Sequence, residues 1–135
     1  MKKLVVLLVA CAPTLGDELA PLPDGGAPVD FGTDIRPLIT ASCGKCHYPT
    51  GATPIGVQTT HLNLSTLGTL RQGGIDTRLD IVVPYDPDGS AIVQKLRGTF
   101  PIGQRMPRNG PYWSEANIEL VERWILQGAK GDDDE

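Results

Sequence analysis

The hydrophobic positions of the chain recur at helical spacing in several short stretches, which are separated by segments rich in proline and glycine. The clearest helix is predicted to begin after Ser114, a good N-cap, and to end at Gly128. Trp113 and Ile118 are spaced to pack against each other across its first turn. Four residues form its apolar face: Leu120, Val121, Trp124 and Ile125.

A second helical pattern covers residues 31–42. Its apolar positions are Phe31, Ile35, Leu38 and Ile39. Asp30, Thr33 or Asp34 can supply the N-cap. Pro37 fits this helix only if the regular part begins near Asp34, or if the helix bends at the proline.

Shorter elements are expected in the middle of the chain. Residues 48–60 are predicted to be irregular, and residues 61–64 alternate like a short extended piece. Ser65 is the expected N-cap of a brief helix, which Gly73 and Gly74 end.

A further helix is predicted from Asp86, as N-cap, through Pro87 in the first turn to Arg97, where Gly98 ends it. No alternation of strands with helices is visible along the chain. The sequence therefore predicts a mainly α fold with three to five short helices and long loops.

Residues 1–10 have the pattern of an export signal. Lys2 and Lys3 precede seven apolar residues, a run too short to span a bilayer. Leu8-Val9-Ala10-Cys11 is similar to a bacterial lipobox, in which the cysteine is lipidated and becomes the new N-terminus. Ordinary signal cleavage after Ala12 is the alternative. Both interpretations place the protein outside the cytoplasm.

The remaining chain divides by composition. Residues 11–29 hold four prolines and three glycines without an apolar period, and predict a flexible linker. Residues 30–130 are predicted to form one small domain, and residues 131–135 an acidic tail in solvent.

Composition and charge limit the core and the partners. The 135 residues are 40% hydrophobic and only 5% aromatic. This composition offers few large apolar side chains for a hydrophobic core, which is therefore lean for a single domain. The net charge is −4, and it becomes −6 when Lys2 and Lys3 leave with the signal. A nucleic-acid partner is therefore not expected.

The main chemical signal is Cys43-x-x-Cys46-His47. This arrangement is typical of covalent attachment of one haem c, in which each thiol adds to a porphyrin vinyl group and the histidine ligates the iron. Because residues i and i+3 of a helical turn project from one side, both sulfurs can reach the same porphyrin edge. The porphyrin would also add apolar surface to the lean core.

Two other chemistries use the same cysteines. Dithiol exchange occurs in thioredoxin-like folds, but those folds need strands alternating with helices. Zinc could be bound by Cys43 and Cys46 with His47 and His61, although His47 directly after Cys46 is awkward for tetrahedral closure. Haem is the preferred interpretation.

Met106 is the predicted second axial ligand of the iron. It lies in a loop constrained by Pro101, Pro107 and Pro111, which can hold a thioether at a set distance with little entropy left to lose. His61 is the competing ligand and would give an iron of lower potential.

Three arginines are candidates for pairing with haem propionates. Arg105 and Arg108 flank the predicted ligand Met106, and Arg71 is a weaker candidate. The alternative is that Arg105 and Arg108 simply face solvent.

Histidine and methionine ligation predicts an electron carrier and not an enzyme. A thioether favours ferrous iron and occupies the position where oxygen or peroxide would bind. No acid-base or nucleophile-base pair elsewhere suggests catalysis. Two alternatives remain: a haem-based module that binds a small ligand when Met106 leaves, and a zinc-binding lipoprotein.

In the order of its motifs, the chain resembles a class I cytochrome c, and more narrowly the haem domains called planctomycete-type cytochrome c. The resemblance covers about residues 30–129. It rests on these segments, besides the haem motif: Asp30-Phe31, Ile35-Arg36-Pro37-Leu38, Leu62-Asn63-Leu64, Gly73-Gly74, Val83-Pro84-Tyr85-Asp86-Pro87-Asp88-Gly89-Ser90, Arg105-Met106-Pro107 and residues 118–129.

The resemblance implies that the first and last helices cross at their apolar faces and that loops enclose one covalent haem. It implies thioether bonds at Cys43 and Cys46, with His47 proximal and Met106 distal. The sequence departs from the family at Tyr85, where glycine is common, and at Arg108-Asn109, where proline or glycine often follows Met-Pro.

The combined expectation is an exported monohaem electron carrier on the periplasmic face of a bacterial membrane. The membrane contact is expected only through lipid on Cys11, and Ala12 after it favours the outer membrane by resemblance. Transient redox proteins are the expected partners of a monomer.

Overall fold

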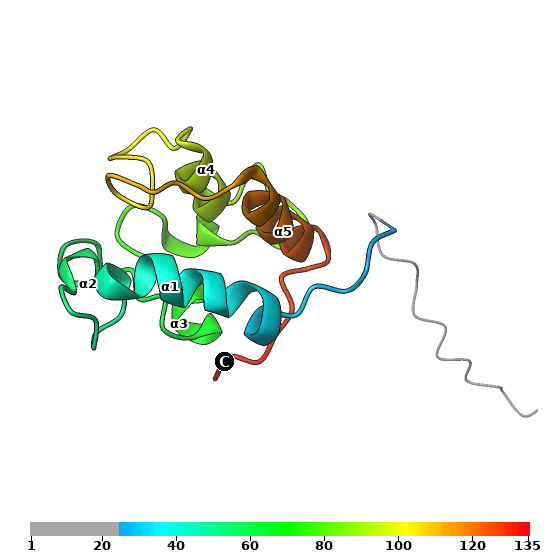
Figure 1. Cartoon of the computed structure of the whole chain (residues 1–135), viewed down its shortest axis with the longest axis horizontal. Coiled ribbons are helices and arrows are strands. Elements are labelled where there is room, and N and C mark those ends of the chain that lie inside the picture. Colours follow the sequence, from blue (N-terminus) through cyan, green and yellow to red (C-terminus); the bar gives the residue numbers. More distant parts are fainter. Residues whose placement is uncertain (1–24) are drawn as a thin grey trace, which may run out of the picture.

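Five short α-helices and two single-turn helical segments carry the fold (Figure 1). The computed structural model describes residues 25–135. The elements, in chain order, are η1 (Phe31–Ile35), α1 (Arg36–His47), α2 (Ile55–Thr60), α3 (Leu67–Gln72), η2 (Arg78–Ile81), α4 (Ala91–Arg97) and α5 (Glu115–Leu126). Within the described residues there is no sheet, only an isolated bridge between Val83 and Asp86. The predicted mainly α class is confirmed.

Several predictions concern residues outside this range. The export signal at 1–10, Cys11 and the linker up to residue 24 lie outside the described residues. In the part that is described, no helix is long and apolar enough to cross a membrane.

The N-terminal and C-terminal helices are in contact, as the resemblance implied. The π-helical turn η1 leads directly into α1 and packs on α5 (Figure 1). Phe31 and Trp124 meet there, with ring centroids 5.3 Å apart. Both side chains are buried, so this aromatic pair joins the two ends of the domain.

Asp30 is the residue that caps the first helical segment. Its carboxylate accepts a hydrogen bond from Thr33 N at 2.8 Å. The π turn then places Pro37 in the first turn of α1. Because an N–H in the first turn has no partner within the helix, the proline costs no helical hydrogen bond there. The helix therefore continues past the proline to His47 without a break.

Two expectations for residues 48–72 are wrong. Residues 55–60 form α2 and are not irregular. The N-cap of α3 is Thr66 and not Ser65: its hydroxyl accepts from Thr69 N, and Thr69 Oγ1 accepts from Thr66 N in return. The predicted end at Gly73 is confirmed, with a φ of 68°.

The predicted start of α4 is also wrong. Asp86 caps a tight turn, with its carboxylate accepting from Gly89 N at 2.9 Å, and the helix begins after Ser90. The side-chain hydroxyl of Ser90 donates to the Asp86 carbonyl at 2.8 Å and is fully buried. Asp86 and Pro87 therefore form the turn that precedes the helix, not its first turn.

The last helix matches its prediction at both ends. The Ser114 hydroxyl accepts from Asn117 N, and Gly128 takes a φ of 96° just after the helix. Trp113 and Ile118 are both buried. Leu120 is only partly buried, and Ile118 joins Val121, Trp124 and Ile125 on the apolar face instead.

The acidic tail is not simply solvated. The carbonyl oxygens of Glu135 and Asp133 accept from Leu67 N at 2.7 Å and Gly68 N at 2.9 Å. These are N–H groups of the first turn of α3, which have no partner within their own helix. Arg71 forms an ion pair with Asp133, so the tail backbone is docked while its Asp side chains stay exposed.

Candidate functional site

The elements surround a cavity of about 630 Å³ that is partly open to solvent. Its walls come from α1, α2, α4 and the loops around residues 62–64, 74–77 and 103–113. The apolar part of the lining includes Ile39, Ile55, Leu62, Leu64, Ile81, Ile92 and Leu96. The volume lies within the range of roughly 300–1,000 Å³ that is usual for small-molecule and cofactor sites.

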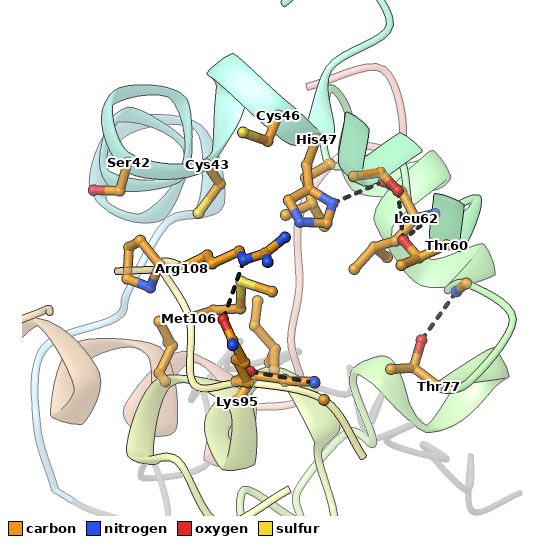
Figure 2. Close-up of a pocket in the computed structure, with 18 of the residues that line it drawn as sticks. Ser42, Cys43, Cys46, His47, Thr60, Leu62, Thr77, Lys95, Met106 and Arg108 are labelled. Carbon is orange, nitrogen blue, oxygen red and sulfur yellow. Dashed lines mark hydrogen bonds between the residues drawn. The ribbon is translucent and has the colours of Figure 1, made fainter. Parts of the chain in front are cut away.

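Cys43, Cys46 and His47 all line this cavity, and they lie on the last turns of α1. In Figure 2 the two sulfurs and the imidazole come from the same wall. Both thiols are free and half-buried. Burial, followed by the nearby Cys46, raises the pKa of Cys43 to about 12. Cys43 is therefore a neutral thiol and lacks the thiolate character that dithiol exchange requires.

His47 is buried, and its orientation is set by a backbone carbonyl. Its Nδ1 lies 3.1 Å from Leu62 O and donates to it in the corresponding tautomer, which leaves Nε2 as the lone-pair nitrogen (Figure 2). Burial lowers the pKa of this imidazole, and so favours its neutral form. A neutral imidazole whose other nitrogen is held by a carbonyl is the usual form of a metal ligand.

Gly56 on α2 packs directly on the imidazole. A Cβ at this position would lie 2.7 Å from Cε1 and 2.8 Å from Nδ1 of His47, and 2.8 Å from the Cys46 carbonyl oxygen. No side chain fits in this space. The glycine thus lets α2 hold the ring against the Leu62 carbonyl.

Gly56→Ala is expected to destabilise the protein by about 1–3 kcal/mol, the usual cost of overpacking. Alanine forms helices better than glycine by about 1 kcal/mol, but the clash with His47 outweighs this gain. Urea unfolding measures the change. Gln58→Ala, at an exposed position of the same helix, is the control. A Gly56→Ala protein as stable as the control would show that His47 does not need this contact.

Met106 lies across the cavity from His47. The methionine belongs to the loop between α4 and α5, is half-buried and lines the cavity. Its backbone N donates to Lys95 O on α4 at 2.9 Å. Figure 2 shows Met106 and Lys95 on the wall that faces the cysteines and His47. Residues distant in the sequence therefore meet at one cavity.

The three candidate arginines have different surroundings. Arg108 lines the cavity, and its Nε donates to Gln104 Oε1 at 3.1 Å. Arg105 is not part of the lining: its Nε donates to Leu96 O, and its guanidinium stacks 4.2 Å from the ring centre of Tyr112. Arg71 is bound to Asp133 and to the Ala129 carbonyl, also away from the lining. Only Arg108 is placed to meet a bound group.

His61 and the zinc alternative receive no geometric support. His61 is exposed at the C-terminal end of α2 and is absent from the cavity lining. Within residues 25–135, no three His, Cys, Asp or Glu side chains are grouped so that they could hold a metal ion. A zinc site built on Cys43 and Cys46 would need a different arrangement of the chain.

Sequence reasoning missed several residues of the cavity. Lys95 and Thr77 line it, and Trp113 lines it with a buried indole N–H that has no hydrogen-bond partner among the described residues. Gly56 and the Leu62 carbonyl hold His47. A lysine in a short helix and a carbonyl in a loop carry no local signal, since only tertiary packing brings them to the site.

Comparisons with protein-family models, with curated proteins and with solved structures found no match to this chain. The site is therefore interpreted from its own geometry.

Proposed function

We propose that this protein is a monohaem c-type cytochrome that carries single electrons between redox proteins. The observation that supports the proposal best is the meeting of four residues at one apolar cavity. Cys43, Cys46 and His47 come from one wall and Met106 from the facing wall. This is the donor set of a covalent haem with histidine and methionine as axial ligands.

The residues present fit a haem in four respects. The apolar lining matches a porphyrin, and the neutral His47 and the thioether of Met106 match the two axial positions of its iron. Two free, half-buried thiols line the cavity and could be attached to the vinyl groups. The unpartnered N–H of Trp113 is a donor that a bound group can satisfy. When bound, the haem supplies the one-electron redox chemistry of its iron.

We further propose the class I cytochrome c fold. Two observations support this assignment. The N-terminal and C-terminal helices are in contact, and α2 and the loop that carries Met106 lie around the cavity. In this fold the chain's own residues would hold the iron: Gly56 and the Leu62 carbonyl orient His47, and the loop carries Met106 on the facing wall of the cavity. A closed sixth position favours electron transfer over catalysis.

The test is an absorption spectrum of the protein expressed with a working haem-ligation apparatus. We expect sharp c-type bands on reduction and a weak far-red band from sulfur–iron coordination in the oxidised protein. A change on addition of carbon monoxide would favour small-ligand binding, with Met106 leaving the iron. Colourless protein would refute a haem function and reopen the zinc alternative.

We propose that the protein is exported and tethered by lipid on Cys11, with the outer membrane favoured. Cys11 lies outside the described residues, so the proposal rests on the sequence alone. Cys11→Ser is expected to move most of the protein from the membrane fraction to the soluble periplasmic fraction, because two acyl chains are lost. Immunoblots of the fractions measure this, with Ala12→Ser as the control. Persistent membrane association of Cys11→Ser would contradict lipidation.

A further inference from the structure

We propose that Lys95 is a positioning residue that holds the Met106 loop in place, so that the thioether stays on the iron. The inference rests on the proposed function, because it concerns the sixth ligand of that iron. It rests on a group of contacts between α4 and the loop that no local sequence pattern predicts.

Lys95 binds the loop with both its backbone and its side chain. Its carbonyl accepts from Met106 N at 2.9 Å. Its ammonium group donates to Ile102 O at 2.5 Å and to Gln104 O at 3.4 Å. One lysine thus contacts the loop at three points, one of them the predicted ligand itself.

The ammonium contacts are the part that a substitution can remove. Both are charge-assisted hydrogen bonds to carbonyl oxygens, which are stronger than neutral ones. The Lys95 side chain also passes near the Phe100 ring, with Nζ 4.8 Å from its centre, and so approaches the start of the loop. Arg105 makes a separate bond from the loop back to Leu96 O, but it does not line the cavity.

Lys95 faces the cavity as well as the loop. It is half-buried, lines the cavity and stands on the same wall as Met106 (Figure 2). A lysine in the last turn of α4 can also stabilise that helix through its dipole. The experiment must therefore separate control of the methionine from general stability.

Imidazole binding to the oxidised holoprotein makes that separation. An added ligand must displace Met106, so its apparent affinity rises in proportion to any weakening of the methionine's hold. Lys95→Met keeps the length of the side chain and removes the ammonium. We expect about tenfold tighter imidazole binding and a weaker far-red band, a change near the lower end of what the loss of hydrogen bonds to a charged group causes.

Two variants serve as controls. Lys130→Met removes an exposed lysine that does not line the cavity, and should leave imidazole binding unchanged. Lys95→Arg keeps a cationic donor and should lie between Lys95→Met and the unsubstituted protein.

The outcomes are distinct. If Lys95→Met and the unsubstituted protein bind imidazole with the same affinity, the inference is overturned. A fall in thermal stability alone would then show a merely structural role for Lys95. The proposed function would still stand after that result if the unsubstituted protein has attached haem and a far-red band. Absence of haem from the unsubstituted protein overturns both proposals.

Discussion

Met106→Ala is expected to leave the haem attached, to abolish the far-red band and to lower the reduction potential by an amount on the order of 0.1–0.3 V. The thioether stabilises ferrous iron, and axial ligands set potentials over a range of about 0.8 V. Spectroelectrochemical titration measures the shift. With the sixth position open, the reduced variant should also bind carbon monoxide, which the unsubstituted protein resists.

Met106→Leu is the matched control for packing. Leucine keeps most of the side-chain volume in the loop but cannot ligate iron. Both variants should therefore lose the far-red band, while Met106→Leu should keep more of the free energy of unfolding than Met106→Ala. Unchanged potentials in both variants, with no far-red band in the unsubstituted protein, would move the ligand role away from Met106. His61 would then be the candidate, although its exposed position on α2 would have to change.

Local signals predicted the last helix well. Ser114 and Gly128 act within a turn of the residues they cap, and their roles are visible in the sequence itself. The same reasoning failed at Asp86, because an aspartate followed by proline starts a turn as readily as a helix. Ser90 could not be chosen over Asp86 without knowing that Ser90 is buried.

Two positions at which the sequence departs from the family it resembles have left-handed backbone conformations. Tyr85 has a φ of 69° and Asn109 a φ of 66°. These are left-handed conformations, which glycine adopts freely and tyrosine rarely. The Tyr85 phenol lies over Gly128, where a Cβ would be 2.8 Å from its oxygen. The backbone at Tyr85 therefore takes a conformation that glycine would adopt more easily.

Four residues predicted from the sequence line the cavity: Cys43, Cys46, His47 and Met106. The first three were visible as a motif, because the proposed haem would need them to be neighbours in sequence. Arg105 and Arg108 were equally close to Met106, yet only Arg108 lines the cavity, because the Arg105 side chain turns towards Leu96 and Tyr112. Adjacency in a loop does not determine the side on which a side chain lies.

Replacing both cysteines, Cys43→Ser with Cys46→Ser, is expected to abolish covalent haem and to remove most of the protein's stability. Haem in the unsubstituted protein should resist extraction by acidified acetone, whereas haem associated with the double variant should be extracted completely. Ser42→Ala, at a neighbouring cavity position on α1, is the control and should keep its haem. Haem that resists extraction in the double variant would contradict attachment through these sulfurs.

The loss of stability follows from the size of the cavity. Without a bound group, the apolar side chains around the cavity of about 630 Å³ would stay in contact with water, and several kcal/mol of burial free energy would be lost at about 25 cal/mol per Å² of apolar surface. A domain of this size has only about 5–15 kcal/mol of stability in total. Without haem the walls must therefore collapse, admit water or unfold. Circular dichroism at 222 nm should show a much weaker, less cooperative thermal transition for the double variant, and a transition as sharp as that of the unsubstituted protein would mean that the chain, not a bound group, supports the cavity.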